Sequence, residues 1–196
     1  MSTFLSVFLL PFFLLLSLSC FCGTTSSGGG SGGGGGNIIK ETCRKSAKGD
    51  PNISYEFCVT SFQSIPKTHN ATLKELGVVA MKLTKTNASN TKSFIKKLLK
   101  NKKLDPYDKL ALKDCKEVYS DAIDSLNEAI KDFKVKRYSE ANIKLSSAMD
   151  SSSTCEQGFN EKKGKKSPLT KENKDVFQLA AISMSIMNMV RGNSYY

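Results

Sequence analysis

The stretch that decides the fold is residues 105–134, DPYDKLALKDCKEVYSDAIDSLNEAIKDFK. Its apolar side chains recur at spacings of three and four residues, which is the period of one face of an α-helix. They are Leu112, Cys115, Val118, Tyr119, Ala122, Leu126, Ala129 and Phe133. Asp105 and Pro106 are typical of a helix N-cap and of the first helical position. The pattern predicts one long amphipathic helix that ends near Lys134.

Three more segments have helical periodicity, and no segment alternates convincingly as a strand would. They are residues 71–100, whose polar middle at 84–91 is a candidate kink, residues 139–160 with Ser139 as the cap, and residues 170–191. Two shorter pieces, residues 37–46 and 54–65, surround a turn at 48–52. Short links between long helices favour antiparallel neighbours. We therefore predict an all-α fold, with a helical hairpin at 37–66 and an up-down-up-down four-helix bundle at 70–192.

The segment before residue 37 has a different composition from the rest. Residues 4–20 read FLSVFLLPFFLLLSLSC, which is typical of a secretory signal peptide, and we place that peptide at 1–23. An uncleaved anchor is the alternative, although a membrane span needs about 20 apolar residues. Residues 24–36, TTSSGGGSGGGGG, predict a disordered spacer. The folded domain is then expected at 37–196.

The chain is strongly basic, with a formal net charge of +11. Such a charge suits nucleic acid, an anionic membrane, a pectin-like polyanion or an acidic protein. The signal peptide argues against nucleic acid, and we expect no membrane partner after its cleavage. The two dense lysine runs, at residues 96–103 and 162–166, are interpreted as solvated helix ends and loops.

Six cysteines are present, and Cys20 and Cys22 fall within the expected signal peptide. An even number in a secreted chain predicts disulfides, and four cysteines allow three pairings. Locality favours two of the bonds, Cys43–Cys58 and Cys115–Cys155. Three sequons predict N-glycosylation, at Asn52, Asn70 and Asn87.

Residues that could carry chemistry are sparse. The single histidine, His69, lies in a loop-like segment, and the cysteines are too far apart for a metal site. Carboxylate pairs such as Asp121 with Asp124 and Glu117 with Asp121 have the spacing of a solvated helix face. The sequence thus predicts a binding module without metal or cofactor, and not an enzyme.

Several local motifs extend this interpretation: Glu41-Thr42-Cys43, Pro51-Asn52, Phe57-Cys58, Tyr138-Ser139-Glu140-Ala141, Leu145-Ser146-Ser147-Ala148, Ser153-Thr154-Cys155 and Ser167-Pro168-Leu169. Together with the signal peptide and the helix pattern, they resemble the plant invertase and pectin methylesterase inhibitor family over residues 38–189. The chain looks most like the branch called putative invertase inhibitors, which includes pollen allergens. The Gly-rich spacer is not part of the family pattern.

The resemblance implies inhibition of a secreted plant enzyme in a one-to-one complex. Invertase inhibitors of the family place a Pro-Lys-Phe stretch, at the start of the third bundle helix, into the sucrose-binding cleft. The matching positions are Lys136, Arg137 and Tyr138, where Lys136 replaces the proline. The structural alternative is that Tyr138 packs on Phe133 or Ala141 while both cations are solvated. Pectin methylesterase inhibitors use a broader face of the second and third bundle helices, which this chain also has.

The leading hypothesis is therefore an inhibitor of acid invertase in the apoplast, with the vacuole as an alternative location. A pectin methylesterase inhibitor is the runner-up. Two other classes stay open: an allergen-like bundle without an enzyme target, and a carrier of a lipid or small ligand in an internal cavity. We expect a monomer, and a dimer formed by swapping the N-terminal hairpin is the alternative.

Overall fold

The computed structural model describes residues 34–68 and 70–192. The expected signal peptide, the expected spacer up to residue 33 and His69 lie outside this part. The described helices are α1 (Gly34–Gly49), α2 (Tyr55–Gln63), the 3-10 turn η1 (Pro66–Thr68), α3 (Leu73–Leu98), α4 (Pro106–Lys134), α5 (Tyr138–Asn160) and α6 (Thr170–Gly192). No strand occurs among these residues, so the all-α prediction is confirmed. None of these helices has the length and apolar character needed to span a lipid bilayer.

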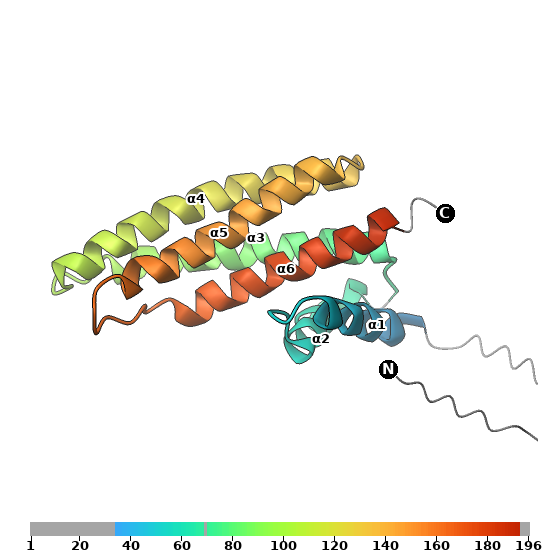
Figure 1. Cartoon of the computed structure of the whole chain (residues 1–196), viewed down its shortest axis with the longest axis horizontal. Coiled ribbons are helices and arrows are strands. Elements are labelled where there is room, and N and C mark those ends of the chain that lie inside the picture. Colours follow the sequence, from blue (N-terminus) through green and yellow to red (C-terminus); the bar gives the residue numbers. More distant parts are fainter. Residues whose placement is uncertain (1–33, 69, 193–196) are drawn as a thin grey trace, which may run out of the picture. The chain divides into compact units, whose positions relative to one another are not determined.

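Helices α3 to α6 form the bundle. Each of them packs against its neighbours in sequence, and contacts between α3 and α6 close the ring (Figure 1). The hairpin of α1 and α2 contacts this bundle through α6. There the backbone N–H of Ser54 donates to the buried Gln178 side chain at 2.9 Å. The up-down-up-down topology predicted from the short links is confirmed.

The helix starts show how the sequence sets the boundaries. Asp105 accepts hydrogen bonds from the backbone N–H groups of Tyr107 (2.9 Å) and Asp108 (3.4 Å), and Pro106 follows it, as predicted. At α3, Thr72 and Glu75 form a reciprocal capping box. α1 begins at Gly34, three residues before the predicted start at Asn37.

The candidate kink at residues 84–91 is not observed as a break, because α3 runs without interruption. The hydroxyls of Thr84 and Thr91 each donate to the carbonyl four residues earlier, both at 2.9 Å. Thr84 also lies 3.2 Å from the hydroxyl of Ser183 on α6. The polar middle of α3 is thus satisfied inside the bundle, and it needs no bend toward solvent.

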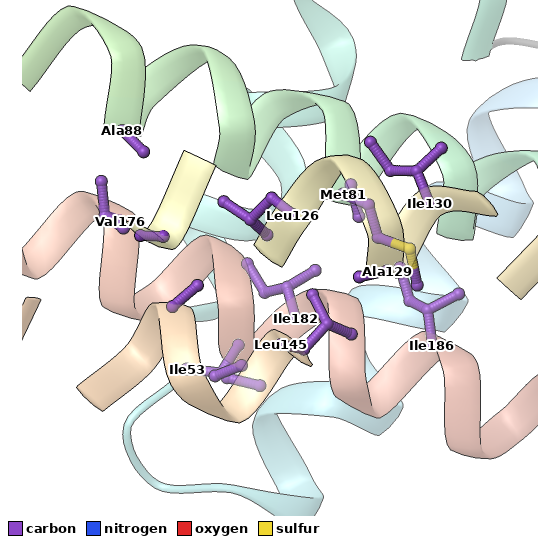
Figure 2. Close-up of a cluster of buried hydrophobic side chains, with 14 of the residues drawn as sticks. Ile53, Met81, Ala88, Leu126, Ala129, Ile130, Leu145, Val176, Ile182 and Ile186 are labelled. Atoms are coloured by element: carbon purple, nitrogen blue, oxygen red, sulfur yellow. The ribbon is translucent and has the colours of Figure 1, made fainter. Parts of the chain in front are cut away.

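The core is filled by side chains from the hairpin turn and all four bundle helices. Figure 2 labels Ile53, Met81, Ala88, Leu126, Ala129, Ile130, Leu145, Val176, Ile182 and Ile186, and all of them are buried. α6 is buried on most sides, as its apolar composition predicts.

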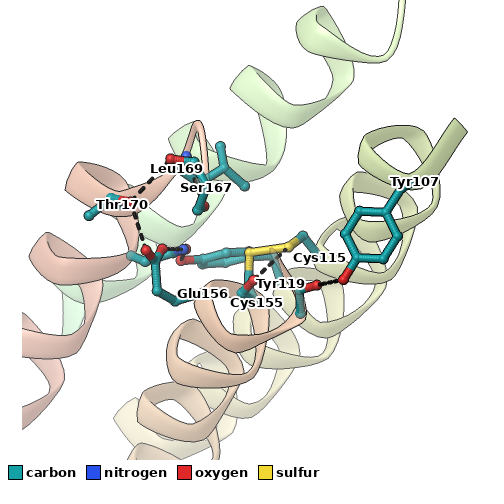
Figure 3. Close-up of a disulfide and its surroundings, with 10 residues drawn as sticks. Tyr107, Cys115, Tyr119, Cys155, Glu156, Ser167, Leu169 and Thr170 are labelled. Atoms are coloured by element: carbon teal, nitrogen blue, oxygen red, sulfur yellow. Dashed lines mark hydrogen bonds between the residues drawn. A yellow bond between two sulfur atoms is a disulfide. The ribbon is translucent and has the colours of Figure 1, made fainter. Parts of the chain in front are cut away.

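Both predicted disulfides are present. Cys43–Cys58 joins the two hairpin helices, with Cα atoms 5.6 Å apart. Cys115–Cys155 joins α4 to α5, with Cα atoms 4.9 Å apart (Figure 3). Beside the second bond, the buried Tyr119 hydroxyl donates to Asn173 at 2.7 Å, and Asn173 donates to Glu156 at 2.7 Å. This end of the bundle is held by a covalent bond and by a hydrogen-bonded chain between α4, α6 and α5.

Candidate functional site

The predicted target-binding residues lie in the connection between α4 and α5. Val135 caps the end of α4, and the next two N–H groups turn back onto it. Lys136 donates to the Phe133 carbonyl at 3.1 Å and Arg137 to the Asp132 carbonyl at 2.9 Å. This pair of bonds is a Schellman motif, whose left-handed position is usually glycine. Lys136 occupies it with φ of +64°, the only positive φ of a non-glycine residue in the described part of the chain.

The start of α5 differs from the prediction. Arg137, not Ser139, is the N-cap, and it makes no side-chain capping bond. Ser139 is the second residue of α5 and is exposed. The prediction was wrong because Arg137 both completes the turn that ends α4 and begins α5. Its carbonyl accepts from Ala141 at 3.1 Å. Three residues therefore join the two helices, and the turn geometry sets where α5 starts.

A buried carboxylate holds the corner. Asp132, 3 % exposed, pairs with Arg137 at 2.5 Å and with Lys144 of α5 at 2.6 Å. Lys144 also reaches Glu128 at 2.9 Å. The hydrogen bond from Lys144, together with Arg137, holds the pKa of Asp132 below its usual range despite desolvation. The pKa of Lys144 is raised, because Asp132 and Glu128 both accept hydrogen bonds from it. Arg137 is thus anchored at one side while its side chain stays 62 % exposed.

Tyr138 is supported from beneath by an aromatic contact. Its ring packs edge-on against Phe133, with centroids 5.7 Å apart and planes at 61°. Phe133 in turn lies against Gly77 of α3, where an added Cβ would come within 2.7 Å of the ring. Tyr138 is half-buried, so the packing contact considered as the structural alternative does exist. The corner presents two exposed cations beside the edge of a supported ring.

Sequence reasoning missed the residues that support the corner: Asp132, Lys144 and Gly77. One signal was available, since Asp132 lies among Ala129, Ile130 and Phe133, where an acidic residue needs a partner if it is buried. No local pattern identified that partner. Lys144 is 12 residues away and meets Asp132 only because α5 folds back along α4.

A second candidate surface is the groove between α4 and α5. Its lining includes Leu110, Asp114 and Val118 of α4 together with Thr154 and Gly158 of α5. An adjoining hollow is lined by Val118, Asn142, Ile143, Ser146, Ser147, Asp150, Ser151 and Thr154. Two large apolar side chains project here, Leu110 at 59 % and Ile143 at 69 % exposure. The broader face expected on these two helices thus has two exposed apolar side chains among polar and acidic neighbours.

The carboxylate pairs noted in the sequence do not form a reactive centre. Glu117, Asp121 and Asp124 are exposed along α4. Within residues 34–68 and 70–192, no three His, Cys, Asp or Glu side chains gather as a metal site would require.

The three sequons differ in accessibility. Asn52 is exposed in the hairpin turn, where its side chain donates to Asp50 at 2.9 Å, and Asn70 is exposed ahead of α3. Asn87 is half-buried within α3 and donates to the Leu83 carbonyl at 3.1 Å. This geometry favours Asn52 and Asn70 as acceptors. Glycan attachment itself stays a prediction.

Comparison with known proteins agrees with this architecture. The model of the family described as plant invertase/pectin methylesterase inhibitor matches residues 37–186. A protein named "Putative invertase inhibitor" from Platanus orientalis is 49 % identical over 154 residues, covering 79 % of this chain and 90 % of that protein. "Pectinesterase inhibitor 12" from Arabidopsis thaliana is 35 % identical over 156 residues, covering 78 % and 87 %. The crystal structure of mutant form A of an Arabidopsis pectin methylesterase inhibitor matches with a TM-score of 0.64 and 24 % identity, over 77 % of this chain and 95 % of that one. That structural match shows the shared fold, and the sequence matches show that this chain belongs to the plant invertase/pectin methylesterase inhibitor family, a family of enzyme inhibitors.

Proposed function

We propose that the chain inhibits a plant acid invertase by forming a one-to-one complex that blocks the substrate cleft. The observation that carries the proposal is the corner at residues 136–138, where a rigid turn presents an anchored arginine beside a supported tyrosine. The 49 % identity to the protein named "Putative invertase inhibitor" supports the choice of target.

The physical argument begins with the target. Glycoside hydrolysis generally uses a pair of carboxylates flanking the scissile bond, so an invertase cleft offers acidic groups. A guanidinium has five N–H donors, and Asp132 leaves the Arg137 side chain largely exposed. Because the turn and the Asp132 pair already order this side chain, little further entropy is lost on binding. Tyr138 adds an aromatic anchor next to the cation.

The corner departs from the family's Pro-Lys-Phe stretch in its backbone. Proline is confined to φ near −65°, whereas Lys136 has φ of +64°. The basic and aromatic character of the stretch is retained, but a proline could not follow this backbone path. We therefore assign the contact to the side chains of Arg137 and Tyr138 and not to a shared loop conformation.

Inhibition of a pectin methylesterase is the second candidate function. The observation that favours it is the groove between α4 and α5, where Leu110 and Ile143 are exposed although both are large and apolar. Exposed apolar patches with a polar rim commonly mark protein interfaces. The 35 % identity to "Pectinesterase inhibitor 12" is consistent with this alternative.

The test is to mix the purified protein with an acid invertase and with a pectin methylesterase at about pH 5 and to measure both activities. Arg137→Gln and Tyr138→Ala should each weaken invertase inhibition by about 2 kcal/mol, roughly thirtyfold. Arg137→Gln is preferred to a charge reversal because a glutamate would lie against Asp132. Lys163→Gln, which removes an exposed loop cation, is the matched control and should change nothing. Melting temperatures separate lost contact from lost folding.

Unchanged inhibition by folded Arg137→Gln and Tyr138→Ala would remove the corner from the interface. Inhibition of a pectin methylesterase would be established as the function by two results together. The wild type would inhibit the methylesterase but not the invertase, and Ile143→Asp would lose the inhibition of the methylesterase. If neither enzyme is inhibited, two interpretations remain: the allergen-like bundle without an enzyme target, and the carrier of a lipid or small ligand.

The proposal includes secretion to the apoplast, with a signal peptide at 1–23, a spacer at 24–36 and the inhibitor domain at 37–196. N-terminal sequencing and mass analysis of the protein from plant tissue test these boundaries. The same spectra report glycans, which we expect at Asn52 and Asn70 before Asn87.

A further inference from the structure

Charge is distributed unevenly along the chain. Residues 76–104 contain no aspartate or glutamate but eight lysines: Lys82, Lys85, Lys92, Lys96, Lys97, Lys100, Lys102 and Lys103. The first five of these lie on α3, whose only acidic residue, Glu75, is part of the capping box. α3 therefore carries a positive charge that its own sequence does not neutralise.

Five of the six lysines of α3 lie on one side of that helix. An α-helix turns about 100° per residue, so Lys74, Lys82, Lys85, Lys92 and Lys96 fall within about a quarter of its circumference. Each of the five is exposed or half-buried.

A second row lies on α4, at Lys109, Lys113, Lys116, Lys131 and Lys134. By the same geometry, the mean direction of this row around the α4 axis is about 150° from that of the α4 residues that line the groove toward α5. Those residues are Leu110, Ala111, Asp114 and Val118. The row therefore lies on the edge of α4 toward α3. One contact supports this placement, since the Lys74 ammonium donates to the Lys134 carbonyl at 3.4 Å. We call these ten residues the lysine face.

No member of the lysine face forms a salt bridge in the described part of the chain. The ion pairs of the described residues use Lys45, Arg137, Lys144, Lys165 and Lys171. By the same geometry, Asp114, Asp121 and Asp132 of α4 point toward the groove with α5, whereas Asp124 and Glu117 lie within about 40° of the lysine row. A concentrated field of one sign attracts counter-ions of the opposite sign and speeds their association.

We propose that the lysine face binds a linear polyanion whose charges are carboxylates, namely an acidic polysaccharide such as polygalacturonate. The row on α3 extends over 22 residues, about 33 Å at 1.5 Å per residue, which suits an extended polymer. All ten cations are lysines, which act as hydrated point charges and need no fixed planar partner, unlike arginine.

The composition of the face favours a polysaccharide over the other polyanions. A membrane-binding helix places aromatic or aliphatic side chains beside its cations. The large exposed apolar residues of the described part are Tyr55, Leu110, Val135 and Ile143. None of them is on α3; Leu110 of α4 lines the groove toward α5, and Val135 follows the last residue of α4. Single-stranded nucleic acids are bound by stacking on aromatic side chains, which the lysine face also lacks.

Two variants with the same change of net charge test the proposal. The first replaces Lys82, Lys85, Lys92 and Lys96 by glutamine, and the second replaces Lys40, Lys48, Lys163 and Lys166, which are exposed outside the lysine face. Glutamine has a helix propensity close to that of lysine, so both should fold, as circular dichroism and melting temperature would verify. Binding to polygalacturonate is measured by calorimetry over a series of salt concentrations, with fully methyl-esterified pectin as the uncharged probe.

We expect the first variant to bind polygalacturonate at least about tenfold more weakly, with a shallower dependence on salt because fewer counter-ions are released. The second variant should stay within about threefold of the wild type, and esterified pectin should not bind. Equal loss in both variants would overturn the proposal, as would absence of wild-type binding at low salt. Tighter binding to phosphatidylserine vesicles or to DNA at the same salt would also overturn it. The proposal is independent of the proposed function, and invertase inhibition should be unchanged in both variants.

Discussion

The two ends of the α4–α5 pair are held together in different ways. At one end the Cys115–Cys155 disulfide joins the helices, and the Tyr107 hydroxyl donates to the Gly158 carbonyl at 2.6 Å. At the other end the described residues form no disulfide between the two helices. A three-residue turn and the carboxylate of Asp132 hold Arg137 and Lys144 instead.

We call the end with the disulfide the structural end, because its bonds hold the two helices together. We call the corner the presenting end, because it exposes the Arg137 side chain to solvent. The disulfide and the neutral hydrogen bond from Tyr119 to Asn173 do not depend on exposed charges, although Asn173 donates in turn to the Glu156 carboxylate. The corner needs Arg137 to be both ordered and accessible, and a buried carboxylate with an exposed cationic partner provides both. A disulfide at the corner would fix the backbone without orienting a cation.

The largest expected effect is on the structural end. Replacing Cys115 and Cys155 by alanine should destabilise the protein by about 2–5 kcal/mol, because the unfolded chain gains the freedom of an open loop. The same change at Cys43 and Cys58 should cost less, since the bond closes a separation of 15 residues instead of 40. Chemical denaturation of both variants measures this. An equal or larger loss of stability in the variant without Cys43–Cys58 would contradict the larger contribution that we assign to Cys115–Cys155.

Loss of the hydrogen-bonded chain beside that disulfide should have an effect of intermediate size on stability. Tyr119→Phe leaves the buried Asn173 oxygen without its donor and should cost about 1–3 kcal/mol. Tyr107→Phe is the matched control, and it should cost less because water can reach the half-buried site. Burial raises the pKa of Tyr119 well above its usual range, so the difference should be constant between pH 6 and 9. A difference that varies over this range would indicate that charge contributes at the structural end too.

The smallest effect is expected at the corner, and it should depend on pH. Asp132 has a lowered pKa in the folded state, so it stabilises the protein above its unfolded pKa of about 3.9. That contribution is lost as the pH falls through the lower folded pKa. The melting temperature of the wild type should therefore exceed that of Asp132→Asn at pH 7, and by less at pH 2.5 than at pH 7. A gap of the same size at both pH values would exclude the ionic account of the corner.

Much of the architecture was predictable because it is encoded locally. The start of α4 at Asp105 and Pro106 depends on cap chemistry within a few residues, and that prediction is confirmed. The cap of α5 was wrong, because a Schellman turn from α4 determined where α5 begins. The polar middle of α3 could not be interpreted without knowing that Ser183 of α6 lies opposite Thr84.

The sequence by itself determined the helical class and the number and order of the bundle helices, and it favoured the two disulfides that are observed. These follow from apolar period, short links and the locality of cysteine pairs, which need no knowledge of how the helices are rotated against each other. Only the tertiary structure decided that Asp132 would order Arg137, that Lys136 would occupy a left-handed position, and that scattered lysines would share one face. Such features depend on the rotation of each helix about its axis, which is set by how four apolar faces pack together in three dimensions.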